Sequence, residues 1–140
     1  MTYRLLDHTA DLGIEVDADT LENLFAECLR AQTDCWTRLQ RVEQLETRDI
    51  DLTAPELSVL LVEFLQETIF LHETEGLVFA AGELAVVEGA SGWSVRGEIS
   101  GERFELARHG LKTLLKAVTY HGLEVRATVD GWQARVIFDI

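Results

Sequence analysis

The sequence predicts an α+β fold, a two-layer sandwich of two main helices packed on a mixed, largely antiparallel β-sheet. Two stretches, residues 21–36 and 55–73, carry apolar residues at helical spacing. Most of the remaining chain alternates apolar and polar residues, as half-buried strands do, and short turn sequences separate these stretches. A length of 140 residues suits one domain with its own core, and we expect residues 1–140 to form it.

Two short strands are predicted at the start of the chain, on either side of a polar turn. The turn is residues 7–11, which hold two aspartates and a histidine. Short acidic side chains often bond to the backbone two residues ahead, so a turn stabilised in this way is one interpretation of the cluster. The alternating apolar residues around it are Leu5, Leu12, Ile14 and Val16.

Two helices follow from start signals and apolar spacing. The first is expected after Asp19, an N-cap acceptor with Glu22 three residues later, and to continue to about Trp36. The second begins near Pro55, the sole proline, which a first helical turn tolerates, and continues to about Glu73. The second helix is so apolar that we expect it at the centre of the fold.

The middle of the chain predicts one exposed strand and one hairpin. Residues 42–52 alternate weakly among charged side chains, which indicates an edge strand with an irregularity near residues 46–48. Residues 77–87 and 93–99 alternate more clearly around a small, glycine-containing connection. These two segments are therefore expected to pair as antiparallel strands.

The last third predicts a short helix over residues 106–115 and two strands over 117–129 and 132–140, joined at an Asp-Gly turn. Alternation continues to the final residue, which indicates a chain end bound into the sheet, although chain ends commonly fray. His72 and His109 are expected at the surface or its boundary.

The charge balance disfavours nonspecific contact with nucleic acid. The chain has 12 basic and 25 acidic residues, a formal net charge of −13, which repels phosphate backbones and better suits a cation or a basic partner. No apolar stretch approaches the length of a membrane span, and the start lacks the features of a signal peptide. We therefore expect a cytoplasmic protein without membrane contact. Cys28 and Cys35, seven residues apart on one helix face, are interpreted as core residues.

Oxygen ligands for a hard cation are the main chemical signal. An ordered terminal carboxylate at Ile140, next to Asp139, requires a counter-charge, and Asp11 in the first turn offers further oxygen. Such ligands suit Ca²⁺ or Mg²⁺, with water at the remaining positions. A zinc site using His8 and His121 is the weaker alternative, because no established zinc spacing supports it. Nucleophile-elbow, P-loop and dinucleotide motifs are absent from the sequence.

Five segments together resemble the archease family, in order and position along essentially the whole chain. Each is weak alone, but their succession is specific. They are DHTADLG (7–13), LLVEFL (60–65), TEGLVF (74–79), KAVTYH (116–121) and VIFDI (136–140), with GE at 101–102 before the late basic segment. The departures are mild: Leu12 stands where the family more often has Ile, and Cys35-Trp36 closes the first helix where a Met-containing end is common.

The resemblance implies an accessory protein for the RtcB-type RNA ligase, which joins RNA ends in tRNA splicing and RNA repair. Such a protein promotes GTP-dependent guanylylation of the ligase and its multiple turnover without being a ligase itself. The implied metal ligands are Asp11, Asp139 and Ile140, holding Ca²⁺ or another hard divalent cation such as Mg²⁺ or Mn²⁺. Lys116 is implied to contact the ligase or its nucleotide, with His8 and Tyr120 in support.

Two other classes of function remain open at this point. A general protein-binding chaperone would use an exposed apolar patch and work without metal. A metal-dependent hydrolase would turn over a small ester or phosphoester alone, and would need an open coordination position with a general base such as His8.

Overall fold

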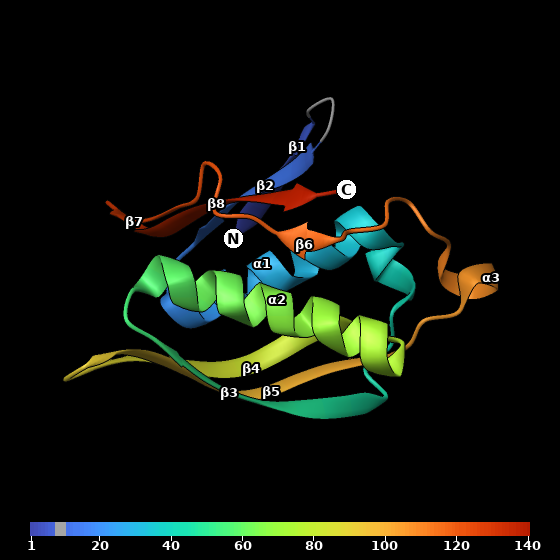
Figure 1. Cartoon of the computed structure of the whole chain (residues 1–140), viewed down its shortest axis with the longest axis horizontal. Coiled ribbons are helices and arrows are strands. Elements are labelled where there is room, and N and C mark those ends of the chain that lie inside the picture. Colours follow the sequence, from blue (N-terminus) through green and yellow to red (C-terminus); the bar gives the residue numbers. More distant parts are fainter. Residues whose placement is uncertain (8–10) are drawn as a thin grey trace.

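Two antiparallel sheets enclose the two long helices (Figure 1). The computed structural model describes residues 1–7 and 11–140. The first sheet has the order β1-β2-β8-β6, with β7 also paired to β8, and the second has the order β3-β5-β4. The strands of the first sheet are β1 (Thr2–Asp7), β2 (Asp11–Ala18), β6 (Ala117–Val118), β7 (Glu124–Thr128) and β8 (Gly131–Asp139). Those of the second are β3 (Glu46–Ala54), β4 (Leu77–Gly89) and β5 (Gly92–Arg103).

The predicted α+β class is confirmed, with two main helices packed on antiparallel strands. The strands divide between two sheets, a division that alternation alone does not specify. Helix α1 (Leu21–Trp36) packs mainly on β2 and β4, and α2 (Leu57–Glu75) packs on β3, β4 and β5. The core therefore lies in the helical layer, between the inner faces of both sheets.

The apolar spacing of both helices explains this core. Phe25 of α1 and Phe64 of α2 are fully buried, and their ring centroids lie 5.5 Å apart. Burying one such side chain contributes about 1.5–3 kcal/mol to folding. Helix α2 ends at Gly76, whose positive φ of 72° suits a residue without a Cβ. No helix in the described ranges is long and apolar enough to cross a membrane.

Side chains of α1 complete the hydrogen bonds of the β4 edge. The Val86 N–H donates to Glu22 Oε2 at 3.0 Å, and the Thr33 hydroxyl donates to the Phe79 carbonyl at 2.7 Å. Backbone groups of an uncovered edge strand would otherwise be open to another chain. These contacts fix α1 against the second sheet.

Several predicted details are wrong. Thr20, and not Asp19, is the N-cap of α1, because its side chain accepts from Asn23 N at 3.1 Å. The register of β3 with β5 is continuous from Glu46, and the irregularity lies in β4, between Phe79 and Ala81.

The final third differs most from the prediction. Helix α3 covers only Leu106–His109, and the long strand expected over residues 117–129 is split into β6 and β7 by a turn. Gly122 in this turn has a φ of 63°, which interrupts the extended chain. His109, expected near the surface, is fully buried.

Candidate functional site

Asp11 and Asp139 lie directly opposite each other in the antiparallel pair of β2 and β8. Their neighbours Leu12 and Phe138 form the next pair and pack in the core. Because side chains alternate between sheet faces, both carboxylates lie on the outer face of the first sheet. A residue near the start of the chain and one next to its end thus lie opposite each other in the sheet.

Asp11 carries an unsatisfied oxygen. Its Oδ1 is buried and has no hydrogen-bond partner in the part of the chain that the structure describes. Asp139 is exposed on the paired strand. Two like charges directly across a ladder repel each other, and a buried acceptor without a partner costs about 1–3 kcal/mol. A cation bound between the two carboxylates would therefore remove their repulsion and stabilise the folded protein.

The end of β8 is held on both sides of the strand. β2 pairs with it on one side, and β6 on the other places Ala117 opposite Asp139. The Lys116 N–H donates to the Asp139 carbonyl at 2.9 Å, and the Thr119 N–H donates to the Ile137 carbonyl at 2.9 Å. Ile140 follows at the end of this double ladder and is 38% exposed.

A side chain of helix α2 forms a hydrogen bond with the backbone of β6. The Val118 N–H, which is directed away from β8, donates to Gln66 Oε1 at 3.0 Å. A two-residue strand makes few ladder bonds of its own. Gln66 therefore helps to hold the segment that borders Asp139.

Gly13 permits close packing two residues from Asp11. Its partner across the ladder is Ile137, which is only 4% exposed although it lies on the outer face. A Cβ at Gly13 would lie 2.6 Å from Ile137 Cδ1. The isoleucine side chain thus lies across the glycine and fills the space beside the acidic pair.

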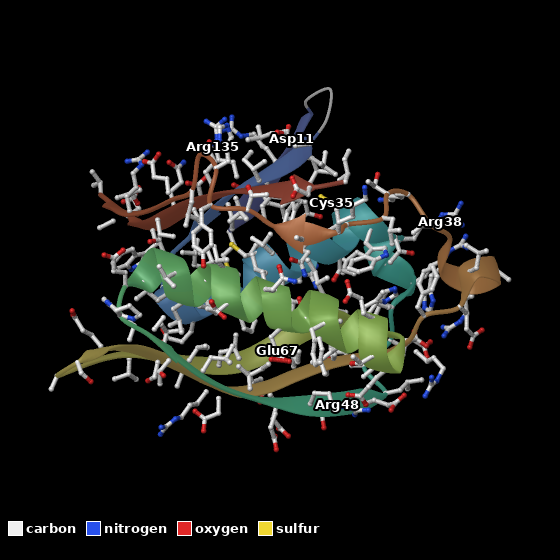
Figure 2. All side chains as sticks on the ribbon, viewed as in Figure 1. Asp11, Cys35, Arg38, Arg48, Glu67 and Arg135 are labelled. Atoms are coloured by element: carbon white, nitrogen blue, oxygen red, sulfur yellow. The ribbon has the colours of Figure 1, made fainter. Side chains whose placement is uncertain are left out.

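Two further predicted site residues, Lys116 and Tyr120, lie on or next to the segment of β6. Lys116 is exposed and borders Asp139 through its backbone, and Tyr120 is 58% exposed just after β6. His8 lies outside the described residues. The structure thus brings Asp11, Asp139, Ile140 and Lys116 together at one end of the first sheet, and Figure 2 shows Asp11 there.

The donors suit a hard divalent cation. Within residues 1–7 and 11–140 no group of three or more His, Cys, Asp or Glu side chains is placed to hold a metal. A metal ion at this site would therefore need the Ile140 carboxylate, backbone oxygens or water beside the two aspartates. An all-oxygen set of this kind suits Ca²⁺, Mg²⁺ or Mn²⁺ better than zinc.

Comparison with known proteins adds the family. The model of the Archease protein family matches residues 3–140. The chain belongs to the archease family. It is 36% identical over 140 residues to "Protein archease" of Methanopyrus kandleri, with 100% of both chains covered. It is 35% identical to that of Pyrococcus furiosus over 135 residues, which cover 96% of this chain and 95% of the relative.

A solved structure supports the archease fold. The solution structure of Methanobacterium thermoautotrophicum protein 1598 superposes with a TM-score of 0.84 at 30% identity, covering 99% of this chain and 98% of that one. The resemblance stated from the sequence segments is therefore confirmed by the family match over nearly the whole chain.

A second polar cluster in this archease was not predicted. Glu102 and His109 are buried, with exposed fractions of 3% and 0%. His109 Nδ1 accepts from the Glu105 N–H at 2.9 Å, so the ring proton is on Nε2 and is donated to Glu102 Oε2 at 3.2 Å. Arg108 forms an ion pair with the same carboxylate, and the Glu43 N–H donates to it at 2.6 Å.

The charge of Glu102 is favoured by these contacts. Burial alone would raise its pKa, but hydrogen bonds from Arg108, the Glu43 N–H and His109 outweigh it and lower the pKa below the ordinary glutamate value. The cluster ties α3 to β5. Strand alternation gives no signal for it, because Arg108 and His109 lie on a helical turn after β5 and Glu43 lies before β3.

Proposed function

We propose that this chain is an archease-type accessory protein that activates an RtcB-type RNA ligase in tRNA splicing and RNA repair. It promotes GTP-dependent guanylylation of the ligase and allows multiple turnover, and it is not itself an enzyme. The observation that carries this proposal is the pairing of Asp11 with Asp139 beside the chain end in an archease-family protein. We place this activity in the cytoplasm.

The acidic pair and the Ile140 carboxylate are the proposed ligands of Ca²⁺ or another hard divalent cation. When bound, such an ion would supply positive charge that offsets the carboxylates of the acidic end and would act as a Lewis acid. The proposal is supported by the two-sided ladder around β8, which fixes the backbone of Asp139 between β2 and β6. That preorganisation lowers the entropic cost of assembling a site between two proteins.

Lys116 is the proposed contact with the ligase or its nucleotide. Its side chain is exposed, and its backbone N–H donates to the Asp139 carbonyl, so the residue lies next to the end of β8. A flexible lysine ammonium suits a phosphate oxygen as a point charge. Tyr120 and His8 are proposed to support this contact, and no direct binding of RNA is needed.

A guanylylation assay tests the proposal. An RtcB-type ligase is incubated with labelled GTP, with and without this protein, and covalent nucleotide on the ligase is measured. We expect stimulation by the wild type, and its loss in Asp11→Ala or after residues are appended beyond Ile140. Asp49→Ala, an exposed aspartate on β3, is the matched control and should stimulate normally.

Other outcomes would favour other functions. Loss of the fold is checked by circular dichroism for each variant. Full stimulation by Asp11→Ala would contradict the role of the pair. Turnover of a phosphoester by this protein alone would indicate a hydrolase, and metal-independent protection of unrelated proteins would indicate a general chaperone.

A further inference from the structure

The longest stretch of the chain without an aspartate or glutamate is residues 106–123. It lies in a protein with 25 acidic residues and a net charge of −13. The stretch contains Arg108 and both lysines of the chain, Lys112 and Lys116. Positive charge is thus concentrated in one segment of an acidic protein.

In the folded protein, two arginines from another part of the chain lie against this segment. The Lys112 N–H donates to the Trp36 carbonyl at 2.8 Å, which places residues after α3 against the end of α1. Arg38 N–H donates to the His109 carbonyl at 3.4 Å, and Arg41 Nη1 donates to the Arg108 carbonyl at 3.0 Å. Neither Arg38 nor Arg41 forms an ion pair with any residue that the structure describes, and Figure 2 shows Arg38 at this end of the molecule.

Three leucines of the same segment are open to solvent. Leu106 is 65% exposed, Leu111 is 50% exposed and Leu114 is 55% exposed. Single exposed leucines are ordinary, but these three lie within nine residues, on the segment whose backbone carbonyls accept hydrogen bonds from Arg38 and Arg41. We name Leu106, Leu111, Leu114, Arg38 and Arg41 the α3 surface.

The α3 surface stands on a rigid support. His109, between the first two of these leucines, is fully buried and bonded to Glu102 of β5. The Lys112 ammonium is bonded to Asp34 Oδ1 at 3.0 Å. A surface fixed in this way loses little conformational freedom when a partner binds.

We propose that the α3 surface docks this protein on an acidic surface of a protein partner that also offers apolar contacts. The inference rests on the proposed function in taking the RNA ligase as that partner. Arginine forks match carboxylates in a bidentate manner, and the leucines supply contact area that a phosphate backbone cannot use. A long polyanion such as RNA would extend past the α3 surface onto the acidic remainder of the protein, which repels it, whereas a local acidic patch on a protein can contact the α3 surface alone.

The position of the α3 surface assigns it a separate task from the acidic pair. The segment that carries it continues directly to Lys116, whose N–H is bonded to Asp139. Docking there brings the acidic pair to a fixed place on the partner. The α3 surface therefore determines the affinity for the ligase, whereas Asp11 and Asp139 determine the stimulation of guanylylation once the complex has formed.

Binding and stimulation are measured separately to test this division. Affinity of the purified ligase for Leu106→Ser/Leu114→Ser and for Arg38→Glu is measured by interferometry, and guanylylation is followed from low to saturating concentration. The matched controls are Val129→Ser, which is 101% exposed, and Arg126→Glu, both near β7 at the far end of the molecule (Figure 1). Unfolding temperatures verify that each variant is folded.

We expect each α3-surface variant to raise Kd at least tenfold, with full stimulation recovered at saturation, and both controls to bind normally. Asp11→Ala should show the opposite pattern, near-normal affinity without stimulation. If the wild type stimulates the ligase and both α3-surface variants bind it with unchanged affinity, the docking inference is overturned and the proposed function is not. A wild type that neither binds nor stimulates overturns the proposed function with it. Loss of binding to labelled RNA in Arg38→Glu, with unchanged ligase affinity, would make the surface a nucleic-acid site and also overturns the inference.

Discussion

Asp11 lies directly across the β2–β8 ladder from Asp139, so residues from opposite ends of the chain share one position in the sheet. Strand pairing forces this contact between two like charges, because shifting the register by one residue would turn the buried faces of both strands to solvent. The repulsion is thus retained in the folded protein, and its physical consequences can be measured.

Calcium should stabilise the wild type, and Asp11→Asn should remove that effect. An ion that binds only the folded state adds about 2.7 kcal/mol to the free energy of unfolding at a hundredfold excess over Kd. Without metal, Asp11→Asn should be more stable than the wild type by about 0.2–1 kcal/mol, because the charge repulsion is gone. Thermal unfolding with calcium or with chelator checks both effects, and Asp49→Asn is the control. Equal calcium stabilisation of Asp11→Asn would exclude this site.

Gln66→Leu should weaken calcium binding although Gln66 does not belong to the acidic pair. The variant leaves the Val118 N–H without its acceptor, which costs about 1–3 kcal/mol and loosens β6 beside Asp139. Gln66→Glu retains an acceptor oxygen and should restore the affinity. Calorimetric titration with calcium measures it. Failure of Gln66→Glu to restore binding, in a folded variant, would contradict the positioning role.

Gly13→Ala should destabilise the protein by about 1–3 kcal/mol through overpacking. The added methyl group would meet Ile137 Cδ1 at 2.6 Å. Ile137→Val removes that atom, so the double variant should recover part of the loss, while the contacts of the methyl group with Leu6 Cβ and the Val136 carbonyl oxygen, each at 3.2 Å, remain. Urea unfolding of the two single variants and the double variant gives the coupling energy. Simple additivity of the two substitutions would show that this contact is not the cause.

Stability should fall in acid partly through Glu102. Its pKa is lowered in the folded protein, so the unfolded state takes up a proton first as the pH falls. The contribution is complete above the ordinary glutamate pKa and is lost as the pH decreases below it toward the folded value. Urea unfolding at pH 7 and at acidic pH measures the loss. Glu102→Gln should be less stable at pH 7 and lose less in acid, whereas Glu98→Gln, an exposed residue of the same strand, should behave as the wild type.

Local pattern predicted the elements that depend on local physics. Apolar spacing predicted α1 and α2 nearly to their ends, and a glycine-containing connection predicted the β4–β5 hairpin. The N-cap of α1 was missed by one residue, because Asp19 and Thr20 both carry suitable oxygens and backbone geometry selects between them. Alternation also failed between β6 and β7, where a turn containing Gly122, with its positive φ, interrupts the predicted strand.

For the candidate site, sequence pattern predicted oxygen ligands near the start and at the end of the chain, and composition alone marks the acid-free segment 106–123. Three relationships became visible only in the folded chain: Asp11 lies opposite Asp139, Gln66 holds β6, and His109 is buried against Glu102. The physical reason is that alternation specifies which face of a strand is buried, but not which distant strand pairs with it or which segment covers it. Those choices belong to the packing of two sheets around two helices, which involves all parts of the chain at once.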